Sequence, residues 1–201
     1  MRSFSQPCDA KEMRRYLGML NFYRLFLNNA ATVLIPLYDI IKTHNKLPPR
    51  SPIVWSTQQI DAFEKSTDML ANAAYLAYPV PGVPVSIAAD ASDIAVAAVL
   101  QQQLPDGTIQ PLAFFSRRLD PTQMLWSICG RELLAVYLGI KHFVHYLEGT
   151  SFTIYTDHSA LISAAATGKL RDIPREVRHL QYIATIRPEW KPGSENITAN
   201  T

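Results

Sequence analysis

The sequence predicts an α/β protein in which a mixed β-sheet carries helices on its faces and a small helical region precedes it. Three strand-like segments follow one another between residues 85 and 119, and a fourth follows a long helix-like segment. Before residue 80 the apolar spacing is helical instead. The segment YPVPGVP (78–84), with three prolines and a glycine in seven residues, marks the boundary. We therefore expect a helical region over residues 1–80 and an α/β domain over residues 81–201.

Composition limits the class of protein to which the chain belongs. It has 201 residues, 48% of them apolar, which suffices for an ordinary buried core, and a net charge of +2. Neither region is basic enough to indicate nucleic-acid binding by charge alone. Cys8 and Cys129 lie far apart, without metal-ligand spacing, and favour a reducing, intracellular compartment, cytoplasmic or nuclear. No apolar run has the length of a membrane span, so we expect no membrane partner.

Three helices are expected in the first region. One runs from about residue 10 to residue 28, with Asp9 as its N-cap and Glu12 placed as in a capping box. The others cover about 32–42 and 56–74, and a proline-rich loop separates them. Four apolar residues near the end of the first helix are interpreted as local helical core, with a protein interface as the alternative: Phe22, Tyr23, Phe26 and Leu27.

The second region alternates strand and helix signals. Its strands are expected at residues 85–91, 95–104, 110–119 and 151–157. DGTI (106–109) has the turn chemistry of a hairpin between the second and third strands. A single long helix is expected from Pro121 to about Leu147, and two shorter ones over 159–166 and 174–184.

Two of these strands end in an aspartate. Asp90 ends the first strand on the same face as Ser86 and Ala88, whose small side chains leave room beside the carboxylate. Asp157 ends the fourth strand. A carboxylate that caps the following turn explains either residue taken alone. If the first and fourth strands are adjacent and parallel, however, Asp90 and Asp157 lie side by side.

A third acid lies in an unusual position on the long helix. On a helical wheel of residues 131–148, Glu132 falls in the middle of the apolar arc, whereas Arg131 falls on the polar side, where Leu134 also strays. A carboxylate buried without a partner is costly, so Glu132 needs a cation, a metal or a proton. The alternative is a long side chain that reaches solvent from the helix edge.

Together the three acids predict a metal site. The long helix lies between the two strands in sequence and can set Glu132 over Asp90 and Asp157. Three oxygen ligands would then converge without a balancing Lys or Arg. Such a ligand set suits Mg²⁺ or Mn²⁺ rather than zinc, and paired ions of this kind serve in-line attack on phosphodiesters.

Several long motifs occur in one order along the chain. They are MRRYLGMLNFYRLFLNNAATVLIPLYDII (13–41), IVWSTQQIDAFEKSTDMLANAAYLAYPVPGVPV (53–85), AADASD (88–93), PLAFFSRRL (111–119), GRELLAVYLGIKHFVHYLEG (130–149) and YTDHSAL (155–161). In this order they resemble the thumb and connecting segments of a reverse transcriptase followed by its ribonuclease H domain. The resemblance is to the Pol polyprotein of gypsy-type (Ty3-like) LTR retrotransposons, and it covers almost the whole chain.

The resemblance implies a ribonuclease H-like fold with a mixed five-stranded sheet, three antiparallel strands followed by parallel ones. It implies hydrolysis of the RNA strand of RNA–DNA hybrids by two-metal-ion catalysis, with Asp90, Glu132 and Asp157 as metal ligands. The family's fourth acid, in a segment of the type N-x-x-A-D, corresponds to Asn200. A neutral ligand there should weaken the second metal, and Asn200 is compatible with natural drift or with an engineered change. The polymerase palm has no counterpart among these motifs, so the chain is not expected to polymerise DNA.

Two functions stay open at this point. The first is an Mg²⁺- or Mn²⁺-dependent ribonuclease H that contacts its hybrid through Ser92, His158, Arg175 and Arg178, for which ordinary surface residues are the alternative. The second is a non-catalytic, retroelement-derived module that binds nucleic acid or protein. Expected partners are an RNA–DNA hybrid and the fingers and palm of the parent reverse transcriptase. If the chain is a non-catalytic module, a protein partner or a second copy of the chain is expected as well.

Overall fold

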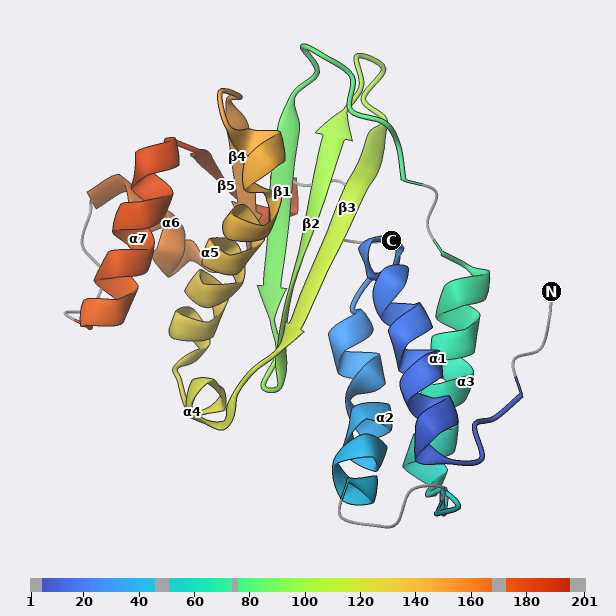
Figure 1. The fold of residues 1–201 in the computed structure, drawn as a ribbon. Helices are drawn as coiled ribbons and strands as arrows, with labels where there is room; N and C mark the ends of the chain where they lie inside the picture. The colour runs from blue at the N-terminus through green and yellow to red at the C-terminus, as the bar shows by residue number, and fades with distance from the viewer. Residues whose placement is uncertain (1–4, 46–50, 74–75, 168–172, 196–201) are drawn as a thin grey trace. The chain divides into compact units, whose positions relative to one another are not determined.

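The chain folds into two compact units, which are described separately (Figure 1). The computed structural model describes residues 5–45, 51–73, 76–167 and 173–195. The units are Met1–Ala74, here the helical unit, and Tyr75–Thr201, here the sheet unit. Within the described ranges, no helix is both long enough and apolar enough to cross a membrane.

In the part of the helical unit that the structure describes, there are three helices and one 3-10 turn. These are α1 (Ala10–Phe22), η1 (Arg24–Phe26), α2 (Ala30–His44) and α3 (Thr57–Ala71). Asp9 caps α1, since its side chain accepts hydrogen bonds from the backbone N–H groups of Lys11 and Glu12. The reciprocal bond of Glu12 goes to the N–H of Cys8 rather than to that of Asp9, at 2.9 Å. Ser56 and Gln59 form a complete capping box at the start of α3.

The first helix ends earlier than the residue 28 that we predicted. The chain leaves α1 after Phe22, makes the η1 turn, and reaches α2 through Asn29, whose φ of 51° lies in the left-handed region. Asn tolerates this conformation better than most residues. The early turn brings Leu27 into the core of the helical unit, where it is 2% exposed. Apolar periodicity alone could not locate the turn, because apolar residues continue through it.

The aromatic residues beside this turn were predicted to belong to the helical core, and this prediction was wrong. Leu27 is core, but Phe22 is 77% exposed, and Tyr23 and Phe26 are also exposed. Phe22 and Tyr23 pack edge to face on each other at 5.1 Å between ring centroids.

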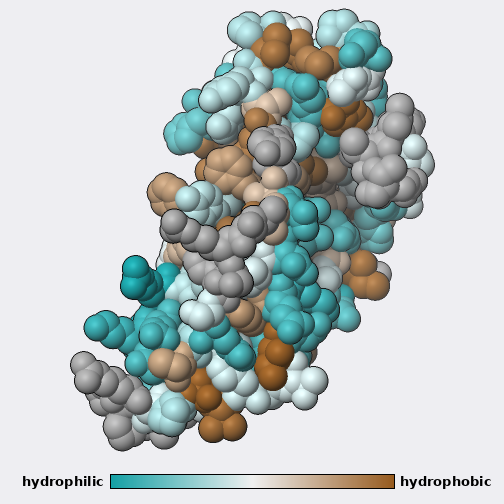
Figure 2. All heavy atoms as spheres, turned by 90° about the vertical axis from the view of Figure 1, so that its right-hand side faces the viewer, coloured by the Kyte–Doolittle hydropathy of each residue, from teal (hydrophilic) through white to brown (hydrophobic). Residues whose placement is uncertain are grey.

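On the face that Figure 2 shows, outside the grey atoms, hydrophobic residues form small groups among hydrophilic ones.

The sheet unit contains five strands and four helices within the described residues. Its strands are β1 (Val85–Ala91), β2 (Ala95–Gln103), β3 (Ile109–Arg118), β4 (Phe152–Thr156) and β5 (Glu189–Pro192). Its helices are α4 (Pro121–Met124), α5 (Ile128–Leu147), α6 (Ser159–Thr167) and α7 (Pro174–Ile186), and a 3-10 turn, η2 (Gly193–Glu195), follows β5.

The strands form one mixed sheet in the order β3-β2-β1-β4-β5. The β1–β2 and β2–β3 pairs are antiparallel, whereas β1–β4 and β4–β5 are parallel (Figure 1). Parallel neighbours need a crossover connection, and the segment containing α4 and α5 supplies it between β3 and β4. The predicted fold class, a mixed five-stranded sheet with helices on it and helices before it, is confirmed.

The long helix predicted from residue 121 to residue 147 is in fact two helices. Asp120 and Gln123 form a capping box for the short α4, which ends at Met124. Ser127 then caps α5 anew, its hydroxyl accepting a hydrogen bond from the N–H of Gly130 at 3.1 Å. The prediction of one helix was wrong because Ser127 is an ordinary polar residue in the sequence and starts a new helix only when its side chain bonds to the backbone.

The α5 helix is buried over more of its circumference than the wheel indicated. Its apolar face packs on the sheet, in a cluster with Ile87, Leu100 and Ile154. Leu134, placed on the polar side by the wheel, is 3% exposed because it packs beside β2 in a second cluster. Arg131 is buried as well, and its place on the polar side of the wheel was wrong.

A close contact at Gly139 sets the distance between α5 and the sheet. A β-carbon added to Gly139 would lie 2.8 Å from the β-carbon of Ala98 on β2 and 3.9 Å from Ile87 on β1. The neighbouring methyl of Ala98 is attached directly to the backbone and cannot rotate away. Only glycine therefore allows the helix to approach this closely.

We predict that Gly139→Ala lowers the free energy of unfolding by about 1–3 kcal/mol, because the added methyl overpacks the contact with Ala98. Gly18→Ala, inside α1, is the matched control, since no atom lies within 4 Å of its added β-carbon. It should be neutral or stabilise by about 0.5–1 kcal/mol through helix propensity. Urea unfolding of both variants measures the difference. A Gly139→Ala protein as stable as the parent would contradict the close contact.

Candidate active site

The register of the two parallel strands brings two aspartates to one end of the sheet. The β1–β4 pairing runs from Val85 opposite Phe152 to Ala88 opposite Tyr155. Two residues further along each strand stand Asp90 and Asp157. Both are exposed. This register therefore places the two carboxylates side by side, at the same level of two neighbouring strands.

Glu132 reaches the same end of the sheet from α5. Its Oε1 accepts a hydrogen bond from the backbone N–H of Ala91 at 3.3 Å, one residue beyond Asp90. The side chain is half-buried against β1 rather than extended into solvent. The helix thus holds this carboxylate over the strand that carries Asp90.

The pKa of Glu132 reflects its burial and the charges around it. Burial is the main cause that raises its pKa to about 7, and the negative charges of Asp90 and Asp157 raise it further. The hydrogen bond from Ala91 and the charge of Arg131 oppose this rise without cancelling it. Three carboxylates therefore interact at this end of the sheet, and one of them is half-protonated near neutral pH.

The donor set fits a hard divalent cation in its chemistry. Carboxylate oxygens are the ligands that Mg²⁺ and Mn²⁺ prefer, and the mutual repulsion of these acids is what a bound cation would relieve. In the part of the chain that the structure describes, however, no three acids, imidazoles or thiols lie close enough together to hold one ion as they stand. Because Asp90 and Asp157 are exposed, their side chains are free to turn toward Glu132.

Gly193 lies directly against Asp157. A β-carbon added to Gly193 would lie 2.8 Å from Cγ of Asp157, would overlap its Oδ1, and would lie 3.4 Å from its backbone nitrogen. Gly193 opens the η2 turn just after β5, which pairs in parallel with β4. The chain that leaves β5 thus forms one wall of the site, and a side chain at position 193 would displace the Asp157 carboxylate from where it lies.

The predicted substrate-contacting residues divide into two pairs. Ser92 and His158 lie next to the acids, within two residues of Asp90 and Asp157 respectively. The hydroxyl of Ser92 is engaged in its own turn, where it donates to the carbonyl of Ala95 at 3.0 Å. His158 is half-buried.

Arg175 and Arg178 lie on α7, the helix that packs on α5. The Arg175 guanidinium lies 4.1 Å from the centre of the Trp126 ring and so contacts the chain itself. Arg178 is exposed. Asn200, the position corresponding to the fourth family acid, lies outside the described residues.

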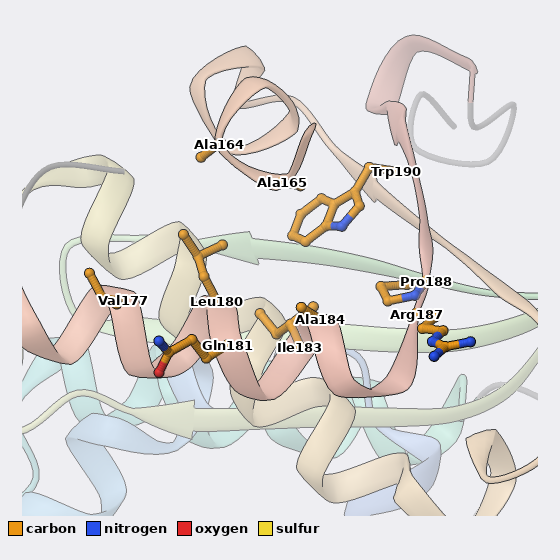
Figure 3. A pocket seen from close by; sticks show the side chains of 10 residues that line it. All are labelled: Ala164, Ala165, Val177, Leu180, Gln181, Ile183, Ala184, Arg187, Pro188 and Trp190. Carbon is orange, nitrogen blue, oxygen red and sulfur yellow. The ribbon is translucent and has the colours of Figure 1, made fainter. Parts of the chain in front are cut away.

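A separate pocket of about 320 Å³ lies between α6, α7 and β5. Figure 3 shows the indole of Trp190 facing Leu180 and Ile183 across it, with Arg187 at its edge. None of the predicted site residues lines this pocket. It is therefore not part of the candidate active site.

Sequence reasoning missed two residues that shape the site. Gly193 has no signal of its own in the sequence, because its importance comes from a contact with Asp157, 36 residues earlier in the chain. Arg131 does stand beside Glu132, and a charged residue next to a buried acid was a usable signal. The helical wheel masked it by placing Arg131 on the polar side.

Comparison with known proteins decides the family. Residues 55–154 match the family model described as the RNase H-like domain found in reverse transcriptase. The chain carries the RNase H-like domain of a retrotransposon reverse transcriptase. The resemblance predicted from the motifs is thereby confirmed.

Curated relatives extend this homology over nearly the whole chain. The Tf2-3 and Tf2-4 transposon polyproteins of Schizosaccharomyces pombe are each 29% identical to it over 201 residues, covering 98% of the chain. The chain spans 15% of the length of these polyproteins. The RNase H-like domain and its preceding helical unit thus correspond to one segment of a much longer protein.

Solved structures show the same fold. The foamy viral protease-reverse transcriptase in complex with dsDNA has a TM-score of 0.76 and 19% identity, covering 94% of this chain and 39% of that one. The same viral protein in complex with an RNA/DNA hybrid has a TM-score of 0.71 and 19% identity, covering 94% of this chain and 25% of that one. At this level of identity the likeness concerns the fold alone.

We predict that Glu132→Gln stabilises the metal-free RNase H-like domain in a pH-dependent way. The pKa of Glu132 rises from an ordinary 4.5 to about 7 on folding, so its contribution to stability is largest below pH 4.5, falls as the pH rises to 7, and then levels off. Glutamine should therefore add about 1–2 kcal/mol above pH 7, a value reduced for partial solvent screening, and nothing below pH 4.5.

Urea unfolding in the presence of a chelator at pH 4.5, 6 and 8 measures this difference. Glu148→Gln is the matched control, because Glu148 is exposed at the other end of α5. A gain from Glu132→Gln that is equal at all three pH values would contradict the assigned cause.

We also predict that Gly193→Ala displaces Asp157. The added methyl cannot share the space of the exposed carboxylate, so the Asp157 side chain should turn away at little cost in stability and its NMR resonances should shift. Spectra of ¹⁵N-labelled parent and variant test this. Unchanged Asp157 resonances would show that the close contact does not exist in solution.

Proposed function

We propose that this RNase H-like domain hydrolyses the RNA strand of RNA–DNA hybrids with Mg²⁺ or Mn²⁺. The observation that carries the proposal is the gathering of Asp90, Glu132 and Asp157 at one end of the sheet, where burial first, and then the charges of the two aspartates, raise the pKa of Glu132 to about 7. The nearest cationic side chain does not neutralise this group, because Arg131 is paired with Asp93 at 2.6 Å. An anionic site left without a side-chain cation is suited to metal ions.

Asp90, Glu132 and Asp157 would hold the metal. When bound, divalent ions supply the positive charge that a phosphodiester needs for in-line attack and lower the pKa of the attacking water. As a ligand near neutral pH, Glu132 would have to be deprotonated. Asp90 and Asp157 are exposed at the strand ends, so their side chains could turn toward the ion.

Asn200 qualifies the proposed activity. It offers a neutral oxygen where the family pattern has an acid, so the second metal binds less tightly and turnover is slow. Ser92, His158, Arg175 and Arg178 stay the proposed contacts to the hybrid. Arg178 is the most available of these, because Arg175 already covers Trp126.

The relatives support the substrate and the setting. A structurally similar viral reverse transcriptase has been solved in complex with an RNA/DNA hybrid. The curated relatives are transposon polyproteins of which this chain spans 15%. The proposed partners are therefore an RNA–DNA hybrid and the fingers and palm of the same polyprotein, acting inside the cell.

We predict that the chain cleaves the labelled RNA strand of a hybrid slowly, and that Asn200→Asp speeds cleavage roughly tenfold or more by restoring a charged ligand. Asp157→Asn should abolish cleavage in either background. Single-turnover assays in Mg²⁺ and in Mn²⁺ measure this. Asp106→Asn, in the turn between β2 and β3, is the matched control for loss of an exposed aspartate.

The proposal fails if the parent and Asn200→Asp proteins are both inactive while circular dichroism shows the native fold. The remaining function would then be that of a non-catalytic module. Binding of the uncleaved hybrid to the Asp157→Asn protein, measured at several salt concentrations, separates a nucleic-acid-binding module from a protein-binding one.

A further inference from the structure

A second set of contacts joins the start of α5 to the turn that follows Asp90. Arg131 stands next to Glu132 in sequence and is only 8% exposed. Its Nη1 donates to the backbone carbonyl of Ser92 at 3.1 Å and to Oδ1 of Asp93 at 2.6 Å. Glu132 accepts a hydrogen bond from the N–H of Ala91. Two consecutive residues of α5 therefore hydrogen-bond to the three residues that follow Asp90.

The turn that Arg131 holds is itself well ordered by hydrogen bonds. The N–H and the hydroxyl of Ser92 both donate to the carbonyl of Ala95, at 2.8 and 3.0 Å. The same hydroxyl accepts from the N–H groups of Ile94 and Ala95, at 3.3 and 3.0 Å. These hydrogen bonds leave the turn little conformational freedom. A contact that fixes the turn therefore also fixes the position of the end of β1.

The guanidinium of Arg131 is paired with Asp93 rather than with one of the three acids. Its short bond to Asp93 is charge-assisted, and such bonds are among the stronger hydrogen bonds in proteins. Asp93 presents its side chain to solvent, 90% exposed, whereas the Arg131 side chain is 10% exposed. Burial excludes Arg131 as a direct contact to a nucleic-acid phosphate, and its pairing leaves the negative charge of the three acids for another cation.

We propose that Arg131, together with Asp93, is a positioning residue for the candidate active site. The clamp formed by Arg131, Ser92 and Asp93 sets how far the end of β1 lies from the first turns of α5. It thereby sets the separation of Asp90 from Glu132, which must be small for both to hold one ion. The inference rests on the proposed function in its consequence for metal binding, but the clamp itself is testable without metal.

Asp93→Ala is the informative variant. The side chain of Asp93 is exposed, so its loss should leave the fold intact while removing the stronger of the two Arg131 bonds. In metal-free protein we expect hydrogen exchange of the Ala91 and Ala95 amides to become about fivefold faster. The amide of Ile154, in the centre of the sheet, should not change. Asp93→Asn, which keeps an acceptor for Arg131, should fall between parent and Ala variant.

Asp106→Ala is the matched control. Asp106 is likewise an exposed aspartate in a hairpin turn of the same sheet, where its carboxylate accepts from the N–H of Thr108 at 2.8 Å. Its loss should leave the exchange of Ala91 and Ala95 unchanged. A second readout is Mn²⁺ affinity by calorimetry, which we expect to fall roughly tenfold in Asp93→Ala and to stay constant in Asp106→Ala.

The outcomes separate the clamp from the proposed function. Unchanged exchange at Ala91 and Ala95, or an equal acceleration at Ile154, overturns the clamp, because the contact is then absent or merely stabilises the whole domain. Faster local exchange with unchanged Mn²⁺ affinity overturns its positioning role. If the parent neither binds Mn²⁺ nor cleaves hybrid even with Asn200→Asp, the proposed function fails, and with it the positioning role, whereas the exchange data still decide whether the clamp exists.

Discussion

The parallel pairing of β1 with β4 is the contact on which the candidate site depends. It requires the chain to cross over between the two strands, and α5 makes most of that crossing. Parallel strands finish at the same edge, so Asp90, near the end of β1, and Asp157, just after β4, come to that edge together. The helix that returns over the sheet carries Glu132 to that edge. Topology brings the three carboxylates to one edge of the sheet, and no local segment does so by itself.

Placing three acids at one edge destabilises the folded state, and packing elsewhere in the domain offsets this destabilisation. Three acids in one place repel each other, and Glu132 is partly desolvated as well. The opposing contributions come from the core under α5 and from the close approach at Gly139, which lets helix and sheet pack tightly. The polar contacts of Arg131 and Ser92 add rigidity at the edge itself.

Much of the fold could be predicted from local pattern. Strand-like patterning placed β1, β2 and β3 to within a residue or so. The resemblance of the motifs added the fifth strand and the family. The end of α1 and the break between α4 and α5 were mispredicted, because the first depends on Leu27 finding a core and the second on the capping hydroxyl of Ser127.

By itself the sequence determined which residues were candidates: a strand-ending Asp90 and Asp157, and a Glu132 in an apolar arc where a carboxylate does not belong. Those are local properties of composition and period. Only the tertiary structure decided that Arg131 is buried and turned toward Asp93, and that Gly193 leaves room for Asp157. Both are contacts between segments 36 to 38 residues apart. No periodicity within one element encodes them, because packing between elements creates them.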